Sequence, residues 1–278
     1  MILSKRKQLR HIVFSVLALM LSLAVVFPLA YGFLGAFKTP EEFSKYPPTV
    51  LPEDFTNLEN FSEAFKAMPF ARYLLNSFVV ALIASTFRLV FAILAAYAFA
   101  YYEFPGKKII FVLVLATMIF PADTLLVTNY LTVSKMGLLD TYLGMCITSF
   151  VGASHMFILR QKFKTIPRDL HSAATVDGCG SMGFLFQIVL PVCRPLLVTL
   201  FVQSFLSSWN SYLWPLLVTN NPEMRTLQVG VTMMTSMDSD NYHIMLAGVT
   251  LTFLPSLILF VILQKNLKGG SLDGALKG

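Results

Sequence analysis

Long apolar stretches separated by short polar segments dominate the pattern of this chain. A helix that crosses the hydrocarbon core of a membrane needs roughly 20 predominantly apolar residues. Six stretches approach or exceed that length, at residues 12–37, 74–101, 109–127, 142–159, 190–217 and 244–263. Because backbone polar groups cannot stay unpaired in lipid, each stretch is expected to be helical. The pattern therefore predicts an all-α, polytopic membrane protein with six transmembrane helices.

The polar segments set the predicted domain organisation. Residues 1–11 form a short N-terminal tail, and residues 12–278 form a single transmembrane domain. Outer loops are expected at 38–72, 128–141 and 218–243, and a loop on the opposite side at 160–189. The prolines within 38–72 exclude one continuous helix there, whereas 128–141 is expected to contain a partial helix.

Composition supports the membrane class. The chain is 56% hydrophobic and only 13% charged, with a mean hydropathy of +0.68, which excludes an ordinary soluble domain. The first apolar run is too long for a signal peptide and no small-residue cleavage site follows it, so an uncleaved anchor is expected. Cys146, Cys179 and Cys193 are scattered and lack metal-ligand spacing, which argues against a disulfide framework.

The distribution of Lys and Arg predicts the orientation. Thirteen of the 21 basic residues fall in the tails and in the loops on one side, six fall in the opposite loops, and Arg88 and Arg194 lie within apolar stretches. The side richer in basic residues is expected to be cytoplasmic, which places both termini and the 160–189 loop inside. The net charge of +6 is thus a topology signal and does not indicate nucleic-acid binding, because no basic patch is interleaved with exposed aromatics.

No catalytic or nucleotide-binding signature occurs in the sequence. The phosphate-binding G-x-x-x-x-G-K-[ST] loop, the H-E-x-x-H zinc motif and the dinucleotide glycine pattern are all missing. The chain is therefore not expected to be an enzyme or to hold a cofactor. Energy for uphill transport would come from a partner or from an ion gradient. A secondary transporter driven by an ion gradient is the alternative, but it would normally show paired intramembrane carboxylates and inverted repeats. A non-transporting membrane scaffold is a further alternative.

One polar segment has the features of a short docking helix. Pro167 stands where a helix can begin, Ala173 and Ala174 favour a helix with little side-chain bulk, and Gly178 can take the left-handed conformation that ends a helix. The pattern Ile-Val-Leu-Pro follows at residues 188–191. A short, capped helix at a membrane surface is suited to contact with another protein.

The spacing of this segment resembles the E-A-A-x-x-x-G loop, followed by I-x-L-P, of ABC-importer permeases. Other segments resemble signatures of the same family: Asn76-Ser77, AAYAFA at 95–100, FPGK at 104–107, GLLDTYLG at 137–144, FILRQ at 157–161, WNSYLWPL at 209–216 and GALKG at 274–278. Together they cover nearly the whole chain and are similar to the carbohydrate-uptake branch, on the MalG/UgpE-like side of the permease pair.

The resemblance implies a function and a set of partners. It implies a permease subunit of a binding-protein-dependent importer in a bacterial or archaeal cell (inner) membrane, for a sugar, an oligosaccharide or an sn-glycerol 3-phosphate-like solute. The implied partners are a second, MalF/UgpA-like permease subunit, a dimer of ATP-binding subunits that hold ATP and Mg, an extracellular or periplasmic solute-binding protein, and membrane lipid. No cofactor is implied in this chain.

The resemblance also implies that the loop is the coupling helix that fits a cleft on the ATPase. The residues carried over are Ser172, Ala173, Ala174, Asp177 and Gly178. Ser172 departs from the family pattern, which has Glu at this position. The carboxylate helps to tie the loop to the ATPase in family members, so its replacement bears on the strength of coupling.

Two residues are candidates for the substrate path. Arg88 lies near the middle of the second stretch, where an ionisable group costs at least about 2.5–3.5 kcal/mol and should face protein or water. It could contact an anionic substrate through its planar guanidinium, or pair with the backbone or serines of neighbouring helices or with another subunit. The family resemblance implies that Asn210 lies beside the outer mouth of the path. Its neighbours Trp209, Tyr212 and Trp214 are expected to be interfacial anchors.

Overall fold

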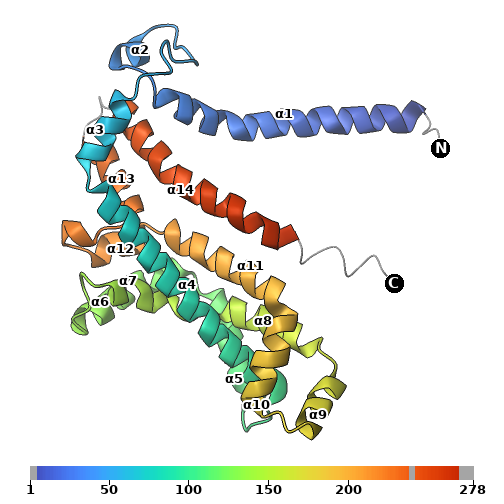
Figure 1. Cartoon of the computed structure of the whole chain (residues 1–278). Helices are drawn as coiled ribbons and strands as arrows, with labels where there is room; N and C mark the ends of the chain where they lie inside the picture. The colour runs from blue at the N-terminus through green and yellow to red at the C-terminus, as the bar shows by residue number, and fades with distance from the viewer. Residues whose placement is uncertain (1–4, 238–241, 269–278) are drawn as a thin grey trace. The chain divides into compact units, whose positions relative to one another are not determined.

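The computed structural model describes residues 5–237 and 242–268, and every regular element within them is helical (Figure 1). The chain divides into two compact units. The first consists of Met1–Pro69 and Val231–Leu254, and the second of Phe70–Gly230 and Pro255–Gly278. The predicted all-α architecture is confirmed.

The first unit begins with the long apolar helix α1 (Lys5–Gly35). Its residues 12–30 are all exposed within the described chain, as expected for a helix surrounded by lipid. The loop that follows is ordered and contains α2 (Pro40–Ser44) and α3 (Glu59–Ala67). A reciprocal capping box between Thr39 and Glu42 starts α2. Asn60 Nδ2 donates hydrogen bonds to the carbonyls of Ala36 and Lys38, which fixes α3 beside the end of α1.

The second unit is built on the 32-residue helix α4 (Phe70–Tyr101). Helices α8 (Ala153–Lys164) and α11 (Leu190–Trp209) pack along α4. Small residues on α4, including Ala81, Ala84, Ala92 and Ala96, are buried and allow close approach. The other elements of this unit are α5 (Lys107–Ala116), η1 (Thr117–Ile119), η2 (Ala122–Leu125), α6 (Leu126–Lys135), α7 (Tyr142–Cys146), η3 (Ile147–Ser149), α9 (Arg168–Val176), α10 (Ser181–Phe184), the π-helix η4 (Leu185–Val189), α12 (Leu213–Val218) and η5 (Pro222–Met224). Helices α13 (Leu227–Met237) and α14 (Tyr242–Lys268) are each divided between the two units.

Within the described residues, three helices are each long and apolar enough to cross a membrane. They are Ile12–Gly35, Phe70–Tyr101 and Ser181–Trp209. Tyr142–Ser149 and Ala153–Lys164 together form a fourth candidate span, bent by 52° at the break between them. The two other predicted stretches correspond to α5 with η1 and to α14. Their described apolar parts are shorter than those of the three spanning helices.

Several predicted boundaries differ from the structure. The third stretch, predicted at 109–127, ends its helix at Ile119, because Pro121 lacks the N–H that would continue it. The fifth, predicted at 190–217, starts earlier at Ser181 and ends at Trp209, and residues 213–218 form the separate helix α12.

The predicted loops are also more helical than expected. Helix α4 begins at Phe70, inside the loop predicted at 38–72. In the loop predicted at 160–189, the first residues belong to α8 and the last residues belong to α10 and η4. The loop at 128–141 contains most of α6, in agreement with the partial helix predicted there. The loop at 218–243 contains α13, and its residues 238–241 lie outside the described residues.

Candidate functional site

The predicted docking helix is present as α9, a nine-residue helix. Pro167 precedes it with extended backbone and Asp169 lies in its first turn, where a negative charge favours the helix dipole. At its end, the N–H of Cys179 bonds to the carbonyl of Ala174 at 2.8 Å and that of Gly178 to the carbonyl of Thr175 at 3.1 Å. This pair of bonds is a Schellman motif, which requires the left-handed φ of +79° found at Gly178.

The predicted coupling residues lie on two faces of α9 and at its C-terminal end. Ser172, Ala173, Asp177 and Gly178 are exposed, whereas Ala174 is only 7% exposed. Leu170 and the 87%-exposed Val176 flank Ala173 at helical spacing on the open face. The structure therefore brings four of the five predicted residues to an accessible surface with apolar character, and turns the fifth towards the core.

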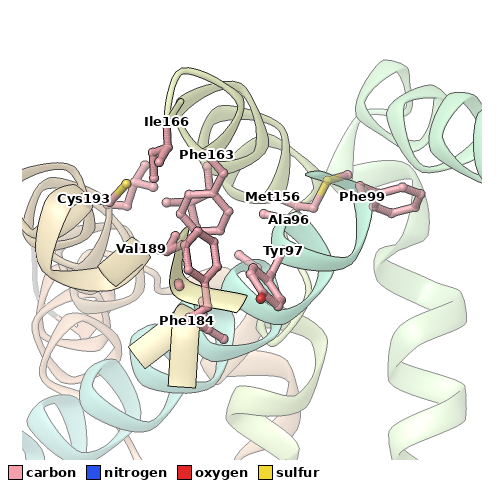
Figure 2. Close-up of a cluster of buried hydrophobic side chains, with 14 residues drawn as sticks. Ala96, Tyr97, Phe99, Met156, Phe163, Ile166, Phe184, Val189 and Cys193 are labelled. Carbon is pink, nitrogen blue, oxygen red and sulfur yellow. The ribbon is translucent and has the colours of Figure 1, made fainter. Parts of the chain in front are cut away.

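Aromatic rings hold the inner face of α9. The ring of His171 stacks on Tyr101 with centroids 5.7 Å apart and meets the edge of Phe184 at 4.7 Å. Ala174 belongs to a buried cluster that joins α4, α8, α10 and η4. In Figure 2, Phe163, Phe184 and Val189 of this cluster face one another, with Tyr97 beside them. The docking helix is thus attached to the packed core of the second unit.

Two tyrosines of α4 add hydrogen bonds to the same region. The hydroxyl of Tyr97 donates to the carbonyl of Ser181 at 2.7 Å, and that of Tyr101 donates to the carbonyl of Phe163 at 3.1 Å. These carbonyls lie on either side of α9, near the end of α8 and at the start of α10. The role of Tyr97 and Tyr101 was missed from the sequence, although both tyrosines stand within or beside the AAYAFA segment.

Arg88 lies beside the break between η3 and α8. Its Nε donates a 2.7 Å hydrogen bond to the carbonyl of Ser149, the last residue of η3. A break in a membrane-spanning helix leaves backbone carbonyls without helical donors, which is costly in a lipid environment. The half-buried guanidinium therefore supplies a donor where the broken span needs one, which fits backbone pairing, one of the two roles predicted for Arg88.

A cavity of about 270 Å³ lies next to this break. Its polar lining comes from four elements or their connections and is uncharged: Asn129, Thr148, Ser149, Ser208, Ser211 and Trp214. Neither Arg88 nor Asn210 lines it. Asn210 is exposed and ends α11, while the serines on both sides of it line the cavity.

The aromatic residues near Asn210 differ in their burial and in their contacts. Trp209 is buried and stacks on Phe205 with ring centroids 6.0 Å apart, so the interfacial role predicted for it is wrong. Trp214 donates from Nε1 to the carbonyl of Gly144 at 3.2 Å, and Tyr212 is exposed.

No group of three or more His, Cys, Asp or Glu side chains able to hold a metal occurs in the part of the chain that the structure describes.

The fold and the site define a helical membrane subunit with a surface helix attached to its core. The chain belongs to the family described as binding-protein-dependent transport system inner membrane component, which it matches over residues 3–269. It is thus an inner-membrane permease component of an ABC importer, and family membership decides against an ion-gradient-driven secondary transporter.

Curated relatives match over most of their length. The chain is 31% identical to the sn-glycerol-3-phosphate transport system permease protein UgpE of Yersinia pestis bv. Antiqua, covering 90% of this chain and 92% of that protein. The UgpE protein of Pectobacterium atrosepticum is 33% identical over the same shares. The arabinooligosaccharides transport system permease protein AraQ of Bacillus subtilis is 31% identical, covering 94% of this chain and 93% of that protein.

A solved structure shares the fold. A chain of a bacterial ABC transporter involved in the import of the acidic polysaccharide alginate superposes with a TM-score of 0.83. It is 21% identical, and the match covers 95% of this chain and 99% of that chain. The architecture described above is therefore that of an ABC-importer permease.

Proposed function

We propose that α9 is the coupling helix through which this non-catalytic subunit is driven by a separate ATPase. The observation that carries the proposal is the division of α9 into an open face at Ser172, Ala173 and Val176 and an inner face packed on Tyr101 and Phe184. A helix built in this way can receive a partner on one side and transmit its displacement on the other. A dimer of ATP-binding subunits would bind the ATP and Mg.

The proposed orientation places α9 and both termini in the cytoplasm. The excess of Lys and Arg on that side supports it, with thirteen basic residues against six. The opposite side would face a solute-binding protein, and a second permease subunit would complete the path. The family description, which names binding-protein-dependent transport, supports these partners.

Movement would pass from α9 to the spans as motion of a packed body. Ala174, Phe184 and Val189 share one cluster with residues of α4 and α8, so α9 cannot shift far without moving their ends. Closure of the ATPases would thereby tilt these helices and switch access to the cavity. Ser172 in place of the family Glu leaves this attachment to the ATPase without its carboxylate.

The chemistry of the cavity supports a carbohydrate or related polyol as the cargo. Hydroxyl and amide side chains with an adjacent indole suit the hydroxyl groups and apolar faces of a sugar, and the lining carries no charged side chain. Arg88 is engaged with the carbonyl of Ser149, which favours neutral sugars over anionic solutes. The names of relatives include both an arabino-oligosaccharide and an sn-glycerol-3-phosphate system at nearly equal identity.

A pair of glycine substitutions tests coupling. Gly178→Val places a β-branched residue at a φ of +79°, whereas Gly180→Val places the same residue at an ordinary φ of −69°; neither glycine has an atom within 4 Å of an added Cβ. We expect Gly178→Val to abolish uptake and substrate-stimulated ATP hydrolysis while the subunit remains in the membrane, and Gly180→Val to retain both. Full activity of Gly178→Val would refute the coupling assignment. Ser172→Glu is expected to strengthen or preserve ATPase association.

A serine pair tests the cargo assignment. Ser208→Ala combined with Ser211→Ala removes two hydroxyls from the cavity, and Ser207→Ala removes an exposed one outside it. We expect the double variant to lower uptake of a labelled neutral oligosaccharide about tenfold or more, and the control to leave it unchanged. If Arg88→Gln instead lowers uptake of sn-glycerol 3-phosphate far more than assembly, the cargo is anionic.

A further inference from the structure

The guanidinium of Arg88 is only partly paired within the second unit. Its Nε donates to the carbonyl of Ser149, but its two terminal nitrogens have no hydrogen-bond or ion-pair partner among the described residues. They are not sealed from the surface either, because the sealed polar atoms without partners belong to other side chains. Since a guanidinium keeps its charge in proteins, the donors of both terminal nitrogens remain available to a group outside the described residues.

Arg88 lies too deep in the membrane to pair with lipid head groups. At about 1.5 Å per residue, about 20 Å of α4 separates it from Leu74 and a similar length separates it from Tyr101, the two ends of the second apolar stretch. The hydrocarbon core of a bilayer is about 30 Å thick, so Arg88 lies near its centre. Long basic side chains reach the head groups only from positions near helix ends. Arg88 therefore needs an acceptor at its own depth.

This chain has no carboxylate to offer at that depth. The sequences of α1, α4, α5, α7, α8, α10, η4, α11 and α14 contain neither Asp nor Glu. A second copy of the chain would bring another Arg88 to the surface and no acid, and like charges that face each other across an interface repel. The acceptor must therefore come from a different molecule.

The surface around Arg88 is apolar and rich in rings. Phe87 and Phe91 flank it on α4 and are both more than two-fifths exposed, and Val151, in the break before α8, is 77% exposed. The ring of Phe150 stacks on that of Phe87 with centroids 4.7 Å apart. A single cation set in an apolar surface at mid-membrane depth is typical of a contact between membrane helices and not of a lipid-facing surface.

An apolar hollow adjoins the guanidinium. Its volume is about 260 Å³, and it lies between α4, α5 and α8, with Phe91, Val114 and Met156 among its lining residues. Gly152 also lines it, and a Cβ added to Gly152 would lie only 3.3 Å from Cδ of Arg88. The hollow and the charge thus belong to one surface. Close packing of a partner would require an apolar side chain in the hollow.

We infer that this surface, formed by Phe87, Arg88, Phe91, Val151 and the hollow at Gly152, binds a membrane-spanning helix of a different chain that carries Asp or Glu at mid-membrane depth. The carboxylate accepts hydrogen bonds from the terminal nitrogens of Arg88, and a neighbouring apolar side chain fills the hollow. The inference rests on the proposed function, in which that chain is the second permease subunit. An anionic solute would satisfy the charge but leave the apolar surface uncovered, and it is an outcome that the experiment distinguishes.

Association of the second permease subunit with this chain, purified in mild detergent with its partners attached, tests the inference. Arg88→Gln removes the charge but keeps an N–H for the carbonyl of Ser149. We expect it to weaken association about thirtyfold or more, and Arg88→Lys, which keeps a charge without the planar fork, to weaken it less. Arg72→Gln is the control, because Arg72 is an exposed residue of the same helix whose Nε also donates to a backbone carbonyl. It should change association less than about twofold.

The outcomes of this measurement are separable. Equal effects of Arg88→Gln and Arg72→Gln would overturn the inference, and so would a loss in Arg88→Gln that is accompanied by a changed near-ultraviolet circular dichroism spectrum, since the fold and not the contact would then have failed. If no second permease subunit is attached to the unmodified chain, the proposed function itself fails. If Arg88→Gln weakens binding of sn-glycerol 3-phosphate and leaves subunit association unchanged, the guanidinium meets a solute and the inference is wrong.

A photo-crosslinker at position 151 identifies what covers the surface. The expected product joins this chain to an apolar segment of the second permease subunit that contains Asp or Glu. Capture of lipid alone, of the ATPase, or of a segment without an acid would overturn the inference. Exchanging the charges, with Arg88→Asp in this chain and Arg at the captured acidic position, should restore the association that each single change weakens. Failure of the exchange to recover any association would contradict a direct pair. None of these readouts depends on transport.

Discussion

Near its start, α4 is joined to a distant segment by the hydrogen bonds of a buried amide side chain. Near its end, apolar and ring contacts with α8, α9 and α10 dominate, accompanied by the Tyr97 and Tyr101 hydrogen bonds. Asn76 is completely buried, and its Nδ2 donates to the carbonyls of Glu223 and Arg225 at 2.7 and 2.9 Å. Its Oδ1 accepts a bond from the Tyr142 hydroxyl at 2.7 Å. Every polar atom of this side chain is therefore directed at a fixed partner.

The far end of α4 uses small residues and rings. Ala92 and Ala96 are buried without polar partners of their own, and Tyr97 and Tyr101 pack with Phe184 and His171 beside α9. Hydrogen bonds depend steeply on angle and fix one arrangement. Apolar contacts are non-directional, so a packed group can move together and keep its burial. The difference indicates that the start of α4 fixes the loop before α13, while its end is suited to following α9.

The largest expected effect on the free energy of unfolding is at the C-terminal end of α4, where apolar contacts dominate. Phe184→Ala removes the ring that contacts both His171 and Tyr101 and leaves a cavity, which should lower the free energy of unfolding by about 3–5 kcal/mol. Titration with sodium dodecyl sulfate, followed by tryptophan fluorescence, measures it. Phe186→Ala is the control, since Phe186 is 62% exposed in the neighbouring π-helix. Equal effects of the two substitutions would show that the ring cluster does not hold α9.

The next effect is at the hydrogen-bonded end. Asn76→Leu leaves two carbonyls and a tyrosine hydroxyl without their partner, so we expect a loss of about 2–3 kcal/mol of unfolding free energy. Limited proteolysis should show increased cleavage around Glu223 and Arg225. Combining Asn76→Leu with Tyr142→Phe should cost less than the sum of the two single changes, because both remove one shared bond. Strict additivity would argue against that bond.

A single hydroxyl at the start of α4 gives a smaller effect. Ser77 Oγ accepts a bond from the backbone N–H of Leu227 at 2.8 Å, and Leu227 is fully buried. Ser77→Ala is expected to lower the free energy of unfolding by about 1–2 kcal/mol, because the buried N–H loses its acceptor. Hydrogen exchange at Leu227 should accelerate while exchange near α9 is unchanged. Faster exchange across the whole chain would contradict a local role.

The smallest effect on the free energy of unfolding is expected from the hydroxyl of Tyr97, near the C-terminal end of α4. Tyr97→Phe keeps the ring and removes the bond to the carbonyl of Ser181, a loss of about 0.5–1 kcal/mol. Because Ser181 starts the helix that follows the docking loop, uptake should fall by a larger factor than unfolding stability suggests. Uptake that tracks stability in both Tyr97→Phe and Ser77→Ala would remove the functional distinction between the two ends.

Local chemistry made the docking helix predictable. Pro167, the alanine pair and Gly178 carry their signals within a few residues, and the helix ends in the left-handed conformation expected of Gly178. Backbone pairing was one of the roles predicted for Arg88, but the carbonyl that it contacts and the partners of Asn76 could not be predicted, because they lie 61 and 147 residues away along the chain. The bend between Ser149 and Ala153 was also missed, because a straight span and a broken span can have the same apolar composition.

The π-helix η4 has a consequence for chain length. Between α10 and α11 the N–H of Leu190 bonds to the carbonyl of Leu185, five residues back, and Pro191 follows with no N–H to donate. A π turn takes up one extra residue, so deleting one residue from Leu185–Val189 would restore ordinary helical pitch and leave Phe184 facing nearly the same way relative to α11. A deletion within α11 itself would instead rotate the residues on its two sides by about 100° relative to one another. Functional relatives should therefore tolerate a one-residue gap at Leu185–Val189 better than one within α11.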